Sequence, residues 1–513
     1  MATFLKQHRY PILLGIGIFI FVFIFFTQIH PVYPYDLDDW KIMHRMRSAY
    51  PSIFEWNPTR ILPEFLMPRC GEVAMTLFYP LRHDITLSIG AVTSLLLASL
   101  ISAYIVAFYR VARKAFSLSV KVSVLLSVLF FAFHFLIFRS QESENQHLFY
   151  SYDLTDHYFY TVPNLLASIC VLLFISERFE YFSLRINPVR KGFFLLLLYL
   201  TIFSNLFDSI ILAAFIGCFL LFQFCKAIGE KRSIREFAHQ YWLHLAVVSL
   251  WLVAIAFEPF GGNSEEITTH ADSFPNALMA SVKAMKYVLV NQTNRLALAL
   301  ISGVILGFAI VSIRQKEASQ TKRLIYTLLS AAAVSGIFLT LLGAASFPYY
   351  LLRIMSVYAV PFFLILAGFV CASILLQRFP HCSAVLPLLL LIVYCDIECR
   401  GKTFQDVQTF LIENDHQYRY RVTPQDILKQ NRQYIQAIIE ADQCGKDSVT
   451  LTVPRFEQDG NWPLSWSYGR SLSKFLYINH LIAHKMTVNL MATGTEQEEA
   501  SATFANSEET TEQ

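Results

Sequence analysis

The sequence predicts an all-α membrane protein with many spans, and three observations support this fold class. The chain has 513 residues, of which 55% are hydrophobic and only 15% charged, and its mean hydropathy is +0.45, a composition typical of membrane proteins. Apolar runs of about 20 residues, the length that crosses a hydrocarbon core of roughly 30 Å, recur as far as residue 397. The loops between them are basic on one side and richer in acidic clusters on the other.

These runs predict about eleven transmembrane helices. In order, they are 10–28, 85–109, 118–138, 161–178, 192–205, 208–225, 241–258, 295–313, 324–345, 354–376 and 383–397, with the fifth and the eleventh short. The first run follows Lys6 and Arg9, as the core of a signal peptide would. However, it is long and no small-residue cleavage site follows it, so we expect a retained helix.

The charges between the spans predict the side that each loop faces. With a cytoplasmic N-terminus, the cytoplasmic loops 110–114, 178–191, 226–235, 314–323 and the segment at Arg378 are all basic. The expected exterior segments are 29–84, 139–160, a turn at Ser204 and Asn205, 259–294, 346–353 and everything after 397. We therefore expect a multi-pass protein of the inner (plasma) membrane whose C-terminus is periplasmic or extracellular. The net charge of +3 gives no reason to expect a nucleic-acid partner.

The residues after the transmembrane domain 1–397 differ in composition. Residues 406–443 are polar with a helical pattern, 448–454 are typical of a strand, and 456–477 are rich in aromatic residues. We expect residues 398–491 to form a small exported α/β domain. Residues 492–513 contain several Glu and no Lys or Arg, so a disordered acidic tail is predicted there.

The first exterior loop has the densest group of charges. Asp36, Asp38 and Asp39 lie within four residues, just after the chain leaves the first span, and Trp56, Arg60 and Glu64 follow in the same loop. A single acidic residue here would be an ordinary solvated loop start beside an interfacial tryptophan. Because carboxylates, Trp, Arg and Glu recur in one long loop, a functional site is favoured.

Other exterior segments add the same kinds of side chain. Asp153, Asp156 and His157 lie among tyrosines before the fourth span, and carboxylates with aromatic rings suit a sugar, although interfacial segments also have this composition. Arg353, at the start of the tenth span, can bind a phosphate bidentately or serve as a snorkelling anchor.

Ionisable residues within the spans are few. His134 and His244 are expected to be satisfied by neighbouring helices, and Asp208 is expected at the exterior break between the fifth and sixth spans, where it reaches water. The nine cysteines form no disulfide or metal framework, and the spacing of Cys395 and Cys399 is weak evidence for either.

The chain resembles the GT-C superfamily in four features taken together. They are the first helix ending in Asp36, Asp38 and Asp39, the long first loop, the acidic second loop and the exported C-terminal segment. Members of the superfamily are multi-spanning glycosyltransferases that use polyprenyl-phosphate-linked sugars. The chain looks most like bacterial families that decorate surface polysaccharides, such as O-antigen glucosyltransferase-like and teichoic-acid glycosyltransferase-like proteins. Many such families have Asn-Gly-Arg where this chain has Asn-Pro-Thr-Arg at 57–60, so the role of Arg60 stays open.

The resemblance implies transfer of a sugar from a polyprenyl-phosphate donor to a cell-surface glycan or lipid acceptor. Asp38 and Asp39 are the first choices for the general base and Asp36 the third. The resemblance leaves the metal open, since clustered acids would permit a divalent cation without requiring one. The expected substrate-binding residues are Trp56, Arg60, Glu64, Asp153, Asp156, His157, Asp208 and Arg353, with Arg60 and Arg353 facing the donor phosphate.

Three alternatives remain. An O-antigen polymerase or ligase would have a similar number of spans, but its large exterior loop usually comes late in the chain, whereas here the long loop is first. A transporter or flippase of lipid-linked sugars would have charged or broken mid-membrane helices and an internal repeat, and neither is clear here. If the chain is a non-enzymatic scaffold, the exterior acids have no catalytic role.

Overall fold

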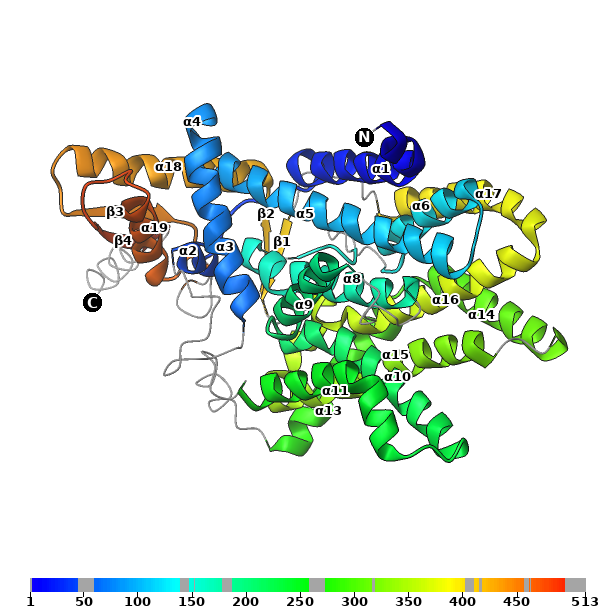
Figure 1. The fold of residues 1–513 in the computed structure, drawn as a ribbon. Helices are drawn as coiled ribbons and strands as arrows, with labels where there is room; N and C mark the ends of the chain where they lie inside the picture. The colour runs from blue at the N-terminus through cyan, green and yellow to red at the C-terminus, as the bar shows by residue number, and fades with distance from the viewer. Residues whose placement is uncertain are drawn as a thin grey trace, which may run out of the picture.

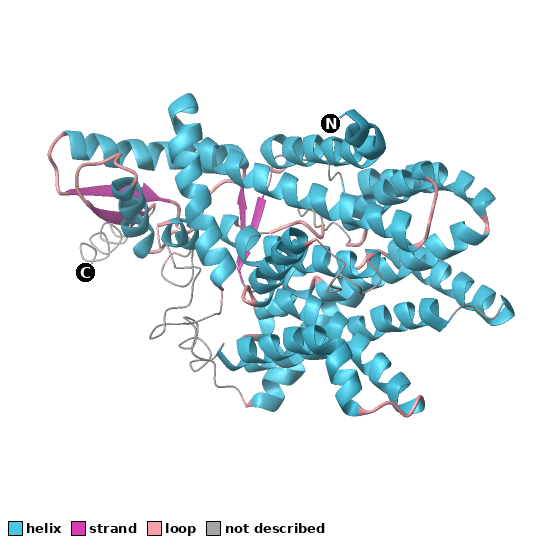
Figure 2. Cartoon of the chain, viewed as in Figure 1, coloured by secondary structure: helices cyan, strands magenta, loops and turns pink. Residues whose placement is uncertain are grey.

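The computed structural model describes residues 2–44, 60–138, 147–151, 153–177, 187–257, 273–315, 319–401, 410–414, 418–455, 461 and 463–493. Helices dominate these residues, and strands occur only near the C-terminal end of the described chain (Figures 1 and 2). Nine of the described helical segments are long and apolar enough to cross a membrane. The chain is therefore an all-α, multi-pass membrane protein, as the sequence predicts.

A helix occupies each of the eleven predicted spans. They are α1 (Ala2–Ile24), continued by η1 (Phe25–Ile29), α5 (Ile85–Arg110), α6 (Val120–Leu136), α8 (Val162–Ser176), α9 (Pro188–Ile202), α10 (Leu206–Gly229), α11 (Ile234–Phe257), α14 (Arg295–Gln315), α15 (Ser319–Ala345), α16 (Ala359–Arg378) and α17 (Leu386–Gly401). The fifth, α9, is short, with 15 residues, as predicted. The eleventh is not short, because η9 (Pro380–Val385) extends α17 to a 20-residue apolar segment.

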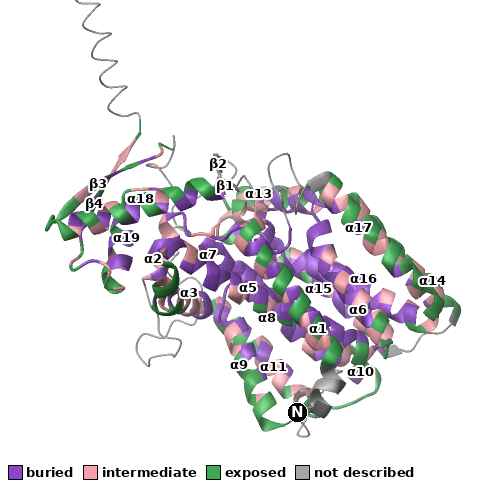
Figure 3. Cartoon of the chain, turned by 90° about the horizontal axis from the view of Figure 1, so that it is seen from above, coloured by how far each residue is buried: buried purple, intermediate pink, exposed green. Residues whose placement is uncertain are grey.

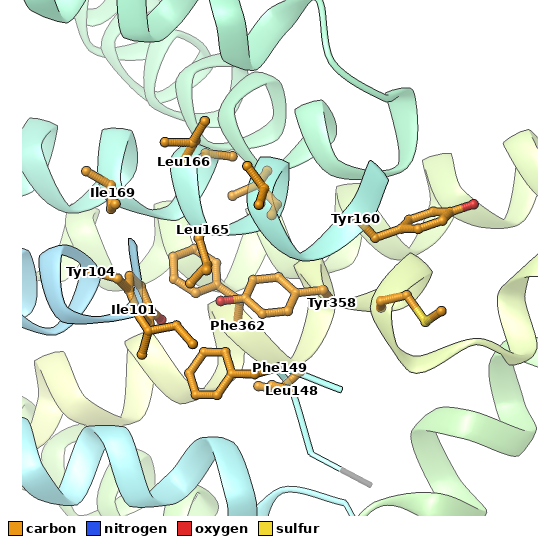
Figure 4. Close-up of a cluster of buried hydrophobic side chains, with 14 of the residues drawn as sticks. Ile101, Tyr104, Leu148, Phe149, Tyr160, Leu165, Leu166, Ile169, Tyr358 and Phe362 are labelled. Carbon is orange, nitrogen blue, oxygen red and sulfur yellow. The ribbon is translucent and has the colours of Figure 1, made fainter. Parts of the chain in front are cut away.

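The bundle has a buried centre and an exposed rim, as Figure 3 shows. The spans that contain α8 and α16 are 89% and 83% buried, whereas the span at α17 is 17% buried. Tyr104 of α5, Tyr358 at the N-cap of α16 and Phe362 of α16 meet at this centre (Figure 4). His134 belongs to the same cluster: its Nε2 is 2.9 Å from the Tyr104 hydroxyl and its Nδ1 2.8 Å from the Phe130 carbonyl. The prediction that neighbouring groups satisfy His134 is confirmed.

His244 of α11 is also buried, and it packs among the rings of Phe174, Phe219 and Tyr241. The second lone histidine is therefore part of the interhelical packing.

Short helices lie at one end of the bundle. They are α2 (Leu37–Met43), α3 (Ile61–Val73), η2 (Ala74–Phe78), α4 (Tyr79–Arg82), α7 (Leu154–Asp156), η4 (His157–Thr161), α13 (Phe274–Lys286), η6 (Tyr287–Gln292), η7 (Pro348–Leu352) and η8 (Ile354–Val357). Figure 1 shows α3 and α4 running across the direction of α5. Val73, Leu77 and Leu81 are exposed along this helical stretch, which suits a helix that lies on a membrane surface.

Contacts at the two ends of the bundle support the predicted alternation of the spans. Loops expected on the exterior contact one another, and so do segments expected in the cytoplasm, where Glu177 pairs with both Arg110 and Lys114. The exterior contacts include Arg60 N to Ser204 O at 2.7 Å, the β-bridge between Phe138 and Thr293, and Asn294 Nδ2 to Asp396 Oδ2 at 2.7 Å.

The C-terminal residues form two small sheets and two helices. The strands β1 (Phe410–Asn414) and β2 (Tyr418–Val422) are antiparallel, and β3 (Ser448–Val453) and β4 (Thr487–Ala492) are parallel. The helices are α18 (Pro424–Gln443) and α19 (Ser467–Ile478). The strand predicted over 448–454 is confirmed. The helix predicted over 406–443 is wrong at 410–414 and 418–422, which are strands. The alternating sequence of β2 favours a strand, and the Thr423–Asp426 capping box starts the helix.

This C-terminal segment packs against the loop that follows the first span. The boundary expected at 397 falls inside α17, and the predicted acidic tail lies outside the described residues after Thr493. Asn431 of α18 donates to the Pro34 carbonyl at 2.7 Å, and the Leu37 amide donates to the Pro463 carbonyl at 3.2 Å. The ring of Trp40 packs against that of Phe475 in α19. The segment therefore covers α2.

The orientation of the bundle predicts which cysteines an impermeant reagent reaches. Cys444 follows α18 and Cys382 lies between α16 and α17, and both are exposed. In right-side-out vesicles, a variant that retains only Cys444 should react with a membrane-impermeant maleimide, and one that retains only Cys382 should react after the membrane is permeabilised. The reverse pattern would overturn the predicted orientation.

A candidate active site where two loops meet

The acidic motif after the first span folds into a reciprocal helix cap. Asp36 is the N-cap of α2, and its Oδ1 accepts from the Asp39 amide at 2.9 Å, while Asp39 Oδ2 accepts from the Asp36 amide at 3.4 Å. An acidic residue at the N-cap and another three positions later satisfy backbone amides that a helix start leaves without partners. The spacing of these two aspartates therefore starts α2 immediately after the first span.

Asp39 also joins the first loop to the second. Its Oδ2 accepts from the Tyr35 amide at 2.7 Å, and its Oδ1 accepts from both the amide and the hydroxyl of Thr155 in α7, at 2.7 and 2.8 Å. The side chain is fully buried. Both carboxylate oxygens are engaged, so Asp39 connects the two loops and leaves no oxygen open to a substrate.

A helix N-cap also orders the acids of the second loop. Asp153 is the N-cap of α7 and accepts from the Asp156 amide at 2.6 Å. Asp156 Oδ1 lies 3.6 Å from a guanidinium nitrogen of Arg353, which in turn lies over the Tyr350 ring at 5.2 Å. The Arg353 side chain is only 19% exposed, whereas a snorkelling anchor keeps its charge in water. Arg353 therefore faces the acids.

Burial and mutual repulsion perturb the acids that lie outside the spans. Burial raises the pKa of Asp39 to about 6, although its hydrogen bonds oppose the shift. Burial, followed by the charges of Asp39 and Asp38, raises the pKa of Asp36 well above its usual value. Burial, followed by the charge of Asp156, does the same for Asp153. The cluster therefore holds protons closer to neutral pH than exposed carboxyls do, as sites of proton transfer often do.

Asp208 is not where the sequence places it. The expectation that it reaches water is wrong, since its side chain is fully buried and neither carboxylate oxygen has a hydrogen-bond partner among the described residues. The turn before it is covered because the Arg60 and Ile61 amides donate to the carbonyls of Ser204 and Phe203. The charge of Asp156 acts on Asp208, which places Asp208 near the same group of acids. A buried carboxyl without a donor is costly, which favours a functional role.

A pocket opens beside the acid cluster, between the end of the first span, the second loop and α18. Its empty space is about 480 Å³, part of it open to solvent. Among the described residues, the wall is aromatic and polar and contains no Lys or Arg. The lining residues are Phe26, His30, Pro31, Val32, Tyr33, Tyr35, His147, Tyr150, Ser151, Asp153, Leu154, His157 and Ile427.

His147 gives this pocket a hydrogen-bond donor. The Phe149 amide donates to its Nδ1 at 3.2 Å, and burial lowers its pKa well below the usual value, so the neutral ring carries its proton on Nε2. That nitrogen is buried and has no partner among the described residues. The Nδ1 of His157 also lacks a partner there. These two imidazoles can bond to hydroxyl groups of a small ligand.

The remaining site residues predicted from the sequence lie outside the pocket wall or outside the described residues. Asp38 is half exposed and pairs with Lys41 at 3.1 Å. Arg60 has a left-handed backbone with φ of 57° and its guanidinium lies 6.0 Å from the Phe159 ring. Glu64 is in the first turn of α3, and Trp56 lies outside the described residues. The structure brings Asp36, Asp39, Asp153, Asp156, His157, Asp208 and Arg353 together.

Sequence reasoning missed His147 and Thr155. Thr155 lies directly before Asp156, but its role depends on a contact with Asp39, 116 residues away in the sequence. All nine cysteines are unpaired, including Cys395 and Cys399. Within the described residues, no group of three or more His, Cys, Asp or Glu side chains could hold a metal ion, so the use of a divalent cation stays a prediction.

The Asp39 junction makes a prediction about stability. Asp39→Ala would leave buried amides of two loops without an acceptor, so we expect it to destabilise the protein by about 3 kcal/mol or more. Thr155→Val removes one donor and should cost about 1–2 kcal/mol, whereas Asp38→Ala, at an exposed ion pair, should cost less than about 1 kcal/mol. Melting temperatures in detergent measure this order, with Thr155→Ser as the control. Equal melting of Asp39→Ala and Asp38→Ala would contradict it.

Comparisons with known proteins identify only a distant structural likeness. No family model matches the chain, and no curated protein sequence matches it. The fold is similar to the crystal structure of an Archaeoglobus fulgidus oligosaccharyltransferase in complex with Zn and sulfate, with 14% sequence identity and a TM-score of 0.43. The match covers 92% of this chain and 62% of that chain, so this chain spans less than two thirds of its length. A likeness this distant gives no residue of this chain a role.

Proposed function

We propose that this chain is a membrane glycosyltransferase. It takes a sugar from a polyprenyl-phosphate-linked donor and transfers it to a cell-surface glycan or lipid acceptor on the outer face of the membrane. The observation that carries the proposal is the junction of the first two exterior loops. Four buried or nearly buried carboxyls, Asp36, Asp39, Asp153 and Asp156, meet there beside Arg353 at the ends of the spans.

The reaction needs a general base at the membrane surface. An acceptor hydroxyl attacks the anomeric carbon of the donor sugar, the bond between that carbon and the phosphate oxygen breaks, and the hydroxyl proton passes to a carboxylate. Asp36 suits this step best. Its Oδ1 caps α2, no hydrogen bond to its Oδ2 is found among the described residues, and its raised pKa brings it closer to the pH at which a base works best.

This assignment changes the order that the sequence favours. Asp39 is a positioning residue in the proposal, because both of its oxygens hold backbone or hydroxyl donors. Asp38 is exposed and pairs with Lys41, so it acts on Asp36 only through its charge. The distinction between three neighbouring aspartates comes from helix capping.

The departing lipid phosphate needs positive charge. Arg353 is the cation that lies beside the acids, and a guanidinium can bind two phosphate oxygens in one plane. In the proposal it exchanges its pairing with Asp156 for the phosphate, and Arg60 supplies a second charge from the same end of the bundle. Asp153, His147 and His157 face the sugar hydroxyls in the adjoining pocket.

The competing functions fit the site less well. A transporter needs ionisable groups along a path through the membrane, but His134 and His244 are held within the interhelical packing. A scaffold would not require a buried cluster of acids, which costs stability. An O-antigen polymerase or ligase would share the outward chemistry and is the second candidate, and its donor would be a lipid-linked oligosaccharide.

The base assignment predicts the behaviour of two matched variants. Asp36→Asn should reduce transfer about 100-fold or more, since it removes the general base, whereas Asp38→Asn should keep most of the activity. The assay supplies purified protein in detergent with a radiolabelled polyprenyl-phosphate sugar and candidate acceptor glycans. Full activity of Asp36→Asn would refute the assignment. Movement of the labelled lipid across vesicles without a new glycosidic bond would refute the function.

The wild-type protein and the Asp38→Asn variant should differ in the pH dependence of sugar transfer. Asp36 must be ionised to accept a proton, and its pKa is raised, so activity should fall with decreasing pH well above the ordinary carboxyl range near 4. The charge of Asp38 raises the pKa of Asp36, so Asp38→Asn should move this fall to lower pH. A fall that stays in place, or moves to higher pH, would contradict the proposed coupling.

A further inference from the structure

The segment around α19 has an unusual charge pattern. Between residues 461 and 495 the sequence contains Arg470, Lys474 and Lys485 but no Asp or Glu. The neighbouring acids are Asp442, in the last turn of α18, and Asp447, after the helix, and they lie 3.0 and 3.5 Å from nitrogens of His484. Within residues 461–495 themselves, the formal charges are therefore all positive.

One face of α19 is buried and the opposite face is exposed. Tyr468, Leu472, Phe475 and Leu476 are buried, and Phe475 packs against Trp40 of α2. The opposite face begins at Trp466, which is 77% exposed. The packed face fixes the helix on the first exterior loop and leaves the other face open.

The open face combines cations with aromatic rings. Residues 466, 470, 474 and 477 follow a spacing of three or four, which places them along one side of a helix. Tyr477 is 38% exposed, and the Lys485 ammonium lies 5.4 Å from its ring centroid. Trp466, Arg470, Tyr477 and Lys485 are all exposed, and we name them the α19 face.

The position of the α19 face favours a soluble anionic polymer over an anionic lipid headgroup as its partner. Figures 1 and 3 show α19 beyond α3, on the side away from the spans. The apolar residues Val73, Leu77 and Leu81 are exposed on the helical stretch of α3, η2 and α4, which suits the membrane surface. The α19 face is separated from the spans by that stretch, so a soluble polymer reaches it more readily than a lipid headgroup does.

We propose that the α19 face binds an anionic glycan chain and holds it near the acid cluster. Indole and phenol rings stack on the C–H faces of sugar rings, while Arg470 and Lys485 neutralise carboxylate or phosphate groups along the chain. The proposal rests on the proposed function only in making this glycan the acceptor, since the binding itself needs neither donor nor transfer. It gives the acceptor a chemical class: a negatively charged polysaccharide.

Binding to a defined probe tests the proposal. The purified full-length chain, in nanodiscs of neutral lipid, is titrated with fluorescent polygalacturonate and with neutral dextran of similar length. We expect polygalacturonate to bind, with an affinity that falls as salt screens the charges, and dextran to bind at least about tenfold more weakly. Trp466→Ala should weaken polygalacturonate binding about tenfold, and Arg470→Gln with Lys485→Gln should weaken it and flatten its salt dependence.

The control is Lys429→Gln, which removes an exposed cation from α18 and should leave binding unchanged. Unaltered melting temperatures show that the variants fold. Equal binding of wild-type and α19 variants, or binding of dextran as tight as that of polygalacturonate, would overturn the proposal. Binding to phosphatidylglycerol vesicles but not to polygalacturonate would show a membrane surface instead. A protein that binds the glycan but transfers no sugar would separate this inference from the proposed function.

Discussion

The site depends on one buried carboxylate that is shared between two loops. Asp39 accepts from Tyr35 and Asp36 on its own loop and from the amide and hydroxyl of Thr155 on the other. A buried anion is tolerated only where donors replace water, so the contact between the two loops stabilises the buried Asp39. The first loop thereby acquires its helix, and the second is held with Asp153 and Asp156 turned toward the same place.

The spans and the C-terminal segment hold this junction from opposite sides. A short segment after Ile29 connects the first span to the cap of α2, and η8 connects Arg353 to α16 of the tenth span. From outside, α18 and α19 cover α2 through Asn431 and Phe475. Acids collected this tightly repel one another and keep their protons at higher pH. In the proposed function, the same arrangement that costs stability places the general base beside a cation.

The parts that sequence could predict are those that depend on local composition. Apolar length predicts the spans, and charge predicts which loops share a face, as the bond between Arg60 and Ser204 supports. The burial of Asp208 could not be predicted, because it results from the first loop packing on a turn far along the chain. The capping role of Asp36 could have been predicted from the sequence, since two acids three positions apart before a helix predict a cap. The role of Thr155 could not, because nothing local points to Asp39.

The most direct test of the account is a structure of the full chain with a non-transferable donor, such as a polyprenyl-phosphonate sugar. The account predicts the phosphonate against Arg353 and the anomeric carbon facing the junction of α2 and α7, near Asp36, with Asp39 still bonded to Thr155. A donor analogue bound away from this junction, with Arg353 still paired to Asp156, would contradict it.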